Sequence, residues 1–592
     1  MRRLLSRGVW MTALVAAVGF SAAPASAQRP KKRPAAAPSP SAATKAPAPV
    51  DLDADNPSAA APPSAVTAKP SKPVVDNSPP AQAGQPSEAA AQAKRLYEGE
   101  KWWDAAKALF RVTSGETGDD EGNKQIAQFN LAKALYKLKF YQAAYSIFSE
   151  IADRPNHLKY NETLLWLAKL ATDLPEPADI IERVGKYNET QVGRFDNKEQ
   201  QDLYWQLNYL LGRYRYRNGQ YPESLALFEK VNRRSKYYVQ AQFFGGVSNV
   251  QMRQSKPAVQ AFQRILGALE EGDVEVEDDA RMRDLAYLSM ARTFYSSSVK
   301  LDETTNAPTV DQTRLSAAVK YWNKVDIASE YWLDALFEES WAYFMAGDYS
   351  HALGNIHTIE SPYFPHSYYP EADVLKAVIY FANCQYDDAL TIVARFRGKF
   401  EPIRDELAKT LEKFKKGANQ EDEFYKFLKD VRDDKATISP KIAPIVKTSL
   451  SDRQLLRNLE YVRLLDEEEV RFKKSPNSFK NSKLADLVKD SVHDARELAI
   501  RNAGDLARNR YERNLADLNE QLRNGQKILI DITSAQRNQL DQAMQGAQVT
   551  VEESKANIVK PDEEHVIWPF NGEYWRDELG FYRQTITSKC GR

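Results

Sequence analysis

The stretch NGQYPESLALFEKV, residues 218–231, decides the fold because its pattern recurs along the chain. Tyr221 is followed by the small residue Ser224, then by the bulky Phe228 and the β-branched Val231. Steps of three and four residues place such side chains on one face of a helix. The same aromatic–small–bulky spacing begins at Trp103, Tyr141, Tyr349 and Tyr386, and it continues without the leading aromatic at Ala258 and Ala318.

A second helix is expected before each of these segments. Twelve positions ahead of the small residue lies another small one, at Ala132, Gly212, Gly246, Ser340 and Ala377. Small residues at both positions let two helix backbones approach closely. The step between units is 34 residues, as from Ser224 to Ala258, which is the period of a helix–turn–helix solenoid. Because one helix pair cannot bury its apolar face alone, the pairs should stack around a continuous core.

These features resemble the tetratricopeptide repeat, including its turns at Gly219–x–Tyr221 and Gly347–Asp348–Tyr349. The resemblance covers residues 89–400 in about eight units. The segment 157–184 departs from the pattern, and residues 185–200 and 297–314 are interpreted as insertions. The resemblance implies an all-α tetratricopeptide helix-turn-helix solenoid with a concave surface that binds partners.

The N-terminal residues predict export. Arg2, Arg3 and Arg7 precede an apolar run that ends at Phe20, and small residues lead to Ala27. This is the pattern of a signal peptide over residues 1–27, cleaved after Ala27. The alternative, an uncleaved anchor, would need roughly 20 apolar residues. We therefore expect a periplasmic protein with no transmembrane span after cleavage.

A proline- and alanine-rich tether is expected over residues 28–88. Residues 28–87 hold 14 of the 30 prolines and no aromatic residue. Such a segment cannot bury enough apolar surface to offset the entropy of the chain.

Beyond the repeats, the sequence predicts charged helices and a linker over residues 401–450 and a long helical region over 451–546. Ser451 and Gln454 fit a capping box that opens the first long helix. For residues 482–546 we expect an antiparallel hairpin or a three-helix arrangement rather than one rod, with Asn524–Gly525 as the turn. The acidic run 466–469 is expected on a solvated helix face.

The two cysteines do not form a disulfide framework. Cys384 is expected to be a small core residue and Cys590 a free thiol. A single long-range bond between them is the alternative.

The sequence offers no catalytic, cofactor or metal site. Its six histidines match no ligand or catalytic motif. The 81 Lys and Arg residues balance 81 Asp and Glu residues, which argues against a nucleic-acid partner. We therefore expect a binding protein rather than an enzyme.

Candidate partner-binding residues lie on the first helices of the repeats. Tyr209, Arg213 and Tyr216 share one face by their spacing, and Trp341 and Phe344 take similar places in a later unit. One interpretation is packing between units. The other is a groove for a peptide or a helix, in which Arg213 meets a carboxylate.

The C-terminal tail, residues 547–592, is rich in aromatic residues. Trp568, Phe570, Tyr574, Trp575, Phe581 and Tyr582 lie within fifteen residues. Left exposed they would form a large apolar patch. We expect the tail to dock on the chain's own helices, with a turn at Asn571–Gly572 and a short helix over 573–581. The alternative is docking on a partner, through Trp568, Phe570 and Trp575.

The whole plan, with the tail WPFNGEYWRDELGFY at residues 568–582, resembles repeat-containing envelope proteins of the bacterial adventurous-gliding motility machinery. The resemblance implies a non-enzymatic periplasmic scaffold or adaptor that binds other envelope proteins in a multiprotein complex. The alternative is a cell-wall-binding or outer-membrane assembly module, which would contact peptidoglycan.

Overall fold

The computed structural model describes residues 81–301, 308–365, 367–414, 420–433, 435–436, 438–443, 445–446, 453–544 and 559–590. The predicted signal peptide, most of the tether and the capping serine at position 451 lie outside these residues. The part described is all-α apart from one antiparallel strand pair, β1 (Val299–Leu301) and β2 (Pro308–Val310), in which Val299 faces Val310.

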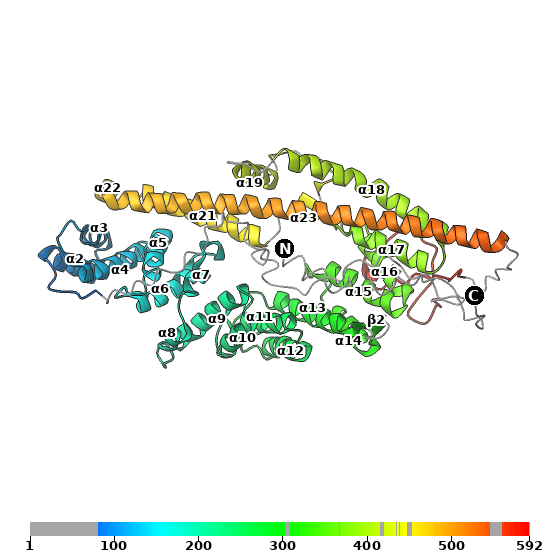
Figure 1. Cartoon of the computed structure of the whole chain (residues 1–592), viewed down its shortest axis with the longest axis horizontal. Helices are drawn as coiled ribbons and strands as arrows, with labels where there is room; N and C mark the ends of the chain where they lie inside the picture. The colour runs from blue at the N-terminus through cyan, green and yellow to red at the C-terminus, as the bar shows by residue number, and fades with distance from the viewer. Residues whose placement is uncertain are drawn as a thin grey trace, which may run out of the picture.

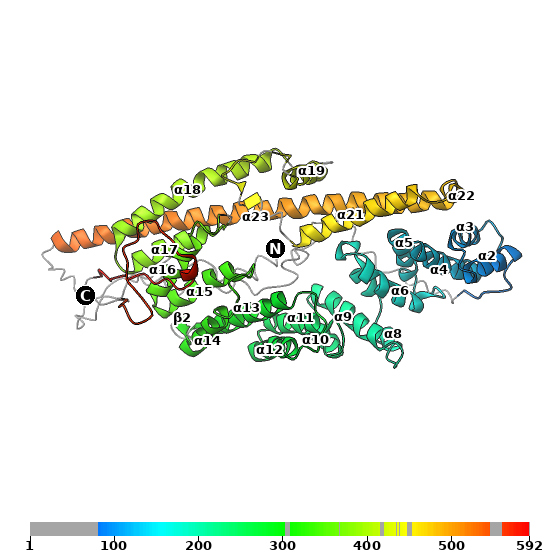
Figure 2. The ribbon, with the colours of Figure 1, turned by 180° about the vertical axis from the view of Figure 1, so that it is seen from behind.

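Eight helix pairs stack in the described chain, which confirms the predicted all-α solenoid. They are α2 (Glu88–Glu98) with α3 (Trp102–Thr113), α4 (Glu121–Lys137) with α5 (Tyr141–Ala152), α6 (Tyr160–Asp173) with α7 (Ile180–Val184), α9 (Gln201–Arg217) with α10 (Tyr221–Phe228), α11 (Tyr238–Gln251) with α12 (Ser255–Glu271), α13 (Asp279–Ser298) with α14 (Gln312–Trp322), α15 (Trp332–Ala346) with α16 (Tyr349–Ile359), and α17 (Pro370–Ala382) with α18 (Tyr386–Glu412). Figures 1 and 2 show these pairs as an arch that runs from α2 to α18.

The irregular parts of the arch fall where the sequence departs from the repeat. A 3₁₀ turn, η2 (Glu176–Ala178), interrupts the degenerate third unit. Helix α8 (Glu189–Gly193) and the β1–β2 pair occupy the two predicted insertions. At the N-terminal end, the predicted tether boundary is too late. Ser87 caps α2 and bonds to Asp119, and the Gly84 amide donates to Asp120, so residues just before 88 already pack on the repeats.

Small residues in the first helix of a pair make room for bulky residues of the second. A Cβ on Gly212 would lie 2.6 Å from the Phe228 ring, and one on Gly246 would lie 2.5 Å from the Phe262 ring. The glycines thus allow each phenylalanine to lie against the backbone of its partner helix. The small residues and the bulky residues predicted from the repeat pattern therefore face one another in the core.

A long helix lies along the arch. Helices α21 (Arg453–Lys473) and α23 (Lys483–Met544) form an antiparallel hairpin around the short α22 (Asn477–Lys480). Helix α23 has 62 residues, so it is about 93 Å long. It packs on α3 and α5 at one end, on α19 (Gln420–Arg432) near its middle, and on α17 and α18 toward the other end. In both views it spans the molecule, with α18 above it and the other helix pairs of the arch below (Figures 1 and 2).

The expected break at Asn524–Gly525 is therefore wrong. Gly525 lies inside α23, where a Cβ would approach the Phe396 ring of α18 to 3.2 Å. This glycine serves close helix packing rather than a turn. Helix α18 also runs past residue 400 to Glu412, so the solenoid and the predicted charged segment share one helix.

A disulfide joins Cys384 to Cys590, which contradicts the expectation of a buried thiol and a free thiol. The reason lies in the tertiary structure, because the C-terminal tail runs beside the turn between α17 and α18. There the Lys589 amide donates to the Asn383 carbonyl at 2.9 Å, and the Gln385 side chain donates to the Thr587 carbonyl. A bond that spans 206 residues in sequence is thus local in space.

Candidate interaction surfaces

Three predicted groove residues are buried between repeats. Tyr209 stacks on Tyr237 with ring centroids 5.0 Å apart. The Arg213 guanidinium lies 4.5 Å from the centroid of Phe244. Tyr216 is also buried. The structure thus corrects the groove interpretation for these residues and supports the alternative, packing between units.

Trp341 and Phe344 of α15 also pack within the repeats. Trp341 is buried, and Phe344 is half-buried against it with ring centroids 5.8 Å apart. Large side chains on a first helix are enclosed wherever the next unit stacks on them, so neither residue presents a free ring to a partner.

Arg213 does meet a carboxylate, but one from its own chain. Arg213 and Arg217 of α9 both bind Glu176 of η2, and Arg457 of α21 binds it from the other side at 2.8 Å. Burial alone would raise the pKa of Glu176, but the three guanidinium groups outweigh it and lower the pKa to about 2. Glu176 is therefore ionised at every physiological pH and ties α21 to the arch.

A second arginine of α21 makes a matching contact. Arg453, one helical turn before Arg457, donates to Glu330 at 2.6 Å, and Arg281 of α13 donates to the same carboxylate at 3.0 Å. The first turn of α21 thus bridges η2 and the loop before α15. These two segments are far apart in sequence.

Glu468 contradicts the expectation that the acidic run 466–469 is solvated. Its side chain is buried and accepts the backbone N–H groups of Gln142 at 3.0 Å and Ala143 at 3.3 Å. It therefore caps the N-terminus of α5 from across the molecule. The neighbouring Tyr461 donates to the Gln142 side chain at 2.6 Å, and Arg471 donates to the Lys139 carbonyl.

The C-terminal tail docks on α16 and α17 of its own chain, as expected. His357 of α16 lies within 5.0 Å, centroid to centroid, of the rings of Phe570, Tyr574 and Tyr582. The Gly580 amide donates to Thr358 Oγ1 at 3.0 Å. The expected helix over 573–581 is reduced to a 3₁₀ turn, η3 (Arg576–Glu578), because Trp575 and Leu579 on either side of it have extended backbones.

Part of the tail faces solvent. We call this the tail patch, and its members are exposed apolar side chains: Val566 (72%), Ile567 (62%), Phe570 (48%), Trp575 (40%) and Phe581 (68%). Trp568 lies behind it, half-buried and stacked on Trp575 at 4.7 Å. Of the three tail residues predicted to bind partners, Phe570 and Trp575 are accessible and Trp568 supports them.

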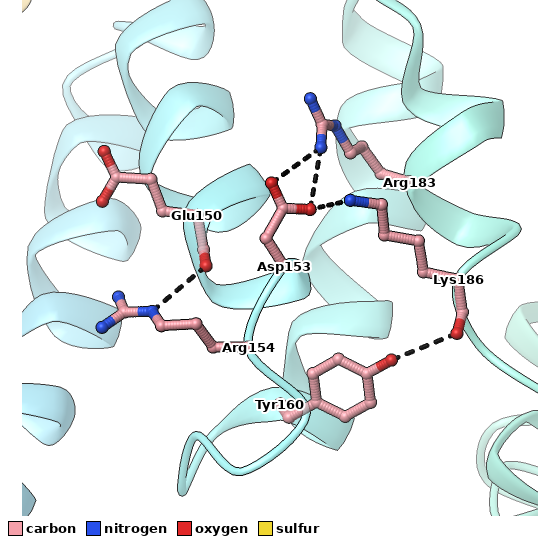
Figure 3. A network of polar contacts seen from close by, with 6 residues as sticks. All are labelled: Glu150, Asp153, Arg154, Tyr160, Arg183 and Lys186. Atoms are coloured by element: carbon pink, nitrogen blue, oxygen red, sulfur yellow. Dashed lines mark hydrogen bonds and ion pairs between the residues drawn. The ribbon is translucent and has the colours of Figure 1, made fainter. Parts of the chain in front are cut away.

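A polar network joins the second and third repeats (Figure 3). Asp153 accepts Arg183 at 2.8 Å and also Lys186, while the Tyr160 hydroxyl donates to the Lys186 carbonyl at 3.2 Å. Next to Asp153, Arg154 donates to the Gln128 side chain of α4 at 2.6 Å. Gln128 and Arg154 also line an open polar hollow of about 470 Å³. These contacts link side chains of the two repeats, which suits a brace between units. Within the described ranges, no group of His, Cys, Asp and Glu residues is arranged to hold a metal ion.

Sequence reasoning missed several of these features. Arg457 and Glu468 act across hundreds of residues, and no local signal marks them. The Cys384–Cys590 bond was only the alternative to a buried thiol and a free thiol. Sequence reasoning also missed a cluster of lysines and aromatic rings on α2, α4 and α6. The spacing of Phe129 and Lys133 on one face of α4 was a usable signal for that cluster.

Comparisons with known proteins do not by themselves assign a fold or a function to this chain. No family model matches the chain. No curated protein matches it. Among solved structures, the apo form of RapI is similar at 12% identity, covering 66% of this chain and 98% of RapI, with a TM-score of 0.29. A circular tandem repeat protein is similar at 13% identity, covering 78% and 99%, with a TM-score of 0.11. The assignment to the all-α helical-repeat class therefore rests on the stacked helix pairs themselves.

In the part of the chain that the structure describes, no helix is both long enough and apolar enough to cross a bilayer.

Proposed function

We propose that this protein is a non-enzymatic periplasmic scaffold or adaptor that binds protein partners in a multiprotein cell-envelope complex, such as a gliding-motility machine. The observation that carries the proposal is the tail patch. Its side chains are 40–72% exposed, although an apolar surface of this kind is costly to leave in water. Aromatic residues are also the ones that most often dominate binding energy at protein interfaces.

The tail patch is held in place rather than presented on a loose terminus. The disulfide, the bond from Gly580 to Thr358 and the packing around His357 fix its backbone on the arch. A surface ordered before binding loses less conformational entropy on association. This favours a stable docking platform.

Two observations support export. Residues 1–27 have the pattern of a cleaved signal peptide. The Cys384–Cys590 disulfide also suits an oxidising compartment such as the periplasm, since cytosolic thiols are kept reduced.

Crosslinking and co-purification from intact envelopes test the proposal, with an affinity tag inserted after Ser58. The wild-type chain should capture stoichiometric protein partners. The double variant Phe570→Asp plus Phe581→Asp should capture about tenfold less of at least one of them. The matched control is Leu498→Asp on α23, at a side chain that is 57% exposed outside the tail patch.

The control variant should retain every partner. The proposal fails if the wild-type chain captures peptidoglycan alone, which would favour a cell-wall-binding module. It also fails if the tail-patch variant and the Leu498 variant capture the same proteins in the same amounts.

A further inference from the structure

A lysine on the first helix of the second repeat lies among three aromatic rings. The Lys133 ammonium is 4.9 Å from the centroid of Tyr97 in α2, 5.3 Å from Phe129 in α4 and 5.8 Å from Trp166 in α6. Lys169, one turn beyond Trp166, lies 4.6 Å from the same indole. We call this set the lysine face. It is built from the first helices of three successive repeats.

The lysine face carries excess positive charge. Burial, followed by the nearby Lys159 and Lys137, lowers the pKa of Lys133. Within the described chain, no carboxylate pairs with Lys133, Lys137 or Lys169.

Two carboxylates on α6, the helix that carries Lys169, have other partners. Asp173 accepts the Tyr136 hydroxyl at 2.6 Å, and Glu162 pairs with Lys159 at 3.0 Å. An ammonium that is half-buried beside like charges gains more from an incoming anion than one in open water does, because solvent screens it less.

We propose that the lysine face binds an acidic segment of a protein partner, with carboxylates of that segment at Lys133 and Lys169. Charge complementarity between the two ammonium groups and the carboxylates selects the anion. The aromatic rings argue against a nucleic acid. Phe129 and Trp166 are each only 7% exposed, so their faces are not free for a base to stack on. The inference rests on the proposed function only in taking the ligand to be a protein.

Calorimetric titration of the exported chain, residues 28–592 with its disulfide intact, tests this. The probes are an N-acetylated, C-amidated octaglutamate peptide and the matching octaglutamine peptide. Octaglutamate should bind saturably and more weakly as salt rises, while octaglutamine should not bind. The double variant Lys133→Gln plus Lys169→Gln should lower the affinity for octaglutamate by about tenfold or more.

The matched control is Lys256→Gln, which removes an exposed lysine on α12 and should leave the affinity unchanged. Circular dichroism melts establish that each variant is folded. The inference is overturned if octaglutamate does not saturate, if both peptides bind equally, or if the double variant binds as the wild type does. Tighter binding of inorganic phosphate or of a DNA oligonucleotide would overturn it in favour of a phosphate site.

The two proposals fail separately. The tail-patch variant, Phe570→Asp plus Phe581→Asp, should bind octaglutamate as the wild type does, because the patch lies on other repeats. A failed titration would therefore leave the co-purification result standing, and the reverse also holds.

Discussion

Within the described residues, six turns between paired helices place one residue in the left-handed backbone region, and two of the six use glycine. The residues are Glu100, Lys139, Gly219, Arg253, Gly347 and Cys384, each two positions before its second helix. In each turn the following amide bonds back five residues, as from Phe140 to the Leu135 carbonyl, which is a Schellman closure. The repeat thus imposes this conformation whatever side chain is present.

Lys139→Gly should raise the free energy of unfolding by about 0.5–1 kcal/mol. A non-glycine residue in this region costs roughly 1–2 kcal/mol, and the extra entropy of glycine in the unfolded chain offsets part of that gain. Gly219→Ala, at the equivalent position, should lower it by a similar amount. Urea unfolding measures the free energy of unfolding of both variants. If both variants change it in the same direction, the left-handed turn does not determine the effect of these substitutions.

The backbone of the tail lies directly against Gly354 of α16. A Cβ there would lie 1.7 Å from the Tyr582 carbonyl oxygen. Gly354→Ala should therefore displace the tail, at a cost of about 1–3 kcal/mol, while the arch stays folded. Limited proteolysis should then cut within residues 559–590. The control, Gly398→Ala in α18, meets no atom within 4 Å and should stabilise the protein by about 1 kcal/mol through helix propensity. Equal protease resistance of the two variants would contradict the docked tail.

At the scale of elements, α21 meets α5 through one buried carboxylate. Burial raises the pKa of Glu468 to about 7, although the backbone bonds from Gln142 and Ala143 oppose this. An unfolded glutamate titrates near 4.3, so the folded state binds the extra proton between these values. The stability that protonated Glu468 gives to the folded state is fully present below about pH 4.3. It is lost as pH rises through about 7.

We therefore expect stability to fall between pH 5 and pH 8, by roughly 2 kcal/mol from this group alone. Glu468→Gln cannot ionise and should show a shallower pH dependence. Guanidinium unfolding at several pH values measures both chains. All other titratable groups are common to the wild type and the variant, so the difference between their stabilities at each pH comes from Glu468. Parallel pH dependences would refute the raised pKa of Glu468.

For the whole molecule, the Cys384–Cys590 disulfide fastens the last residues of the chain to the end of the arch. Reduction, or the double variant Cys384→Ser plus Cys590→Ser, should lower stability by about 2–4 kcal/mol, as loss of a long-range disulfide does. It should also expose the tail to protease. Since α23 and α21 hold the arch independently, the helical content should not change by circular dichroism. Loss of helix on reduction would mean that the disulfide supports the solenoid as well as the tail.

The local sequence was sufficient to predict the helices of the solenoid. The period of three and four residues, the 34-residue step and the glycine turns predicted an all-α helical solenoid with about eight units, and its insertions fell at the predicted positions. It also predicted a long helical region over residues 451–546, although the expected break at Asn524–Gly525 within it was wrong. Such features depend on neighbours within one or two helical turns, and the order of residues records them directly.

Tertiary structure alone decided how these elements meet. The pair Asn524–Gly525 is typical of turns, yet Gly525 packs against Phe396 and lies inside one helix of 62 residues. Arg213 meets its carboxylate at Glu176, 37 residues away, where one repeat stacks on the next. Glu468 meets the backbone amides of α5 because the chain folds back on itself over 326 residues. The energy of a buried charge depends on the partners that surround it in space. No spacing along the chain carries that information, so the partner of each buried charge and the docking of the tail were settled only when the arch and the long helix came together.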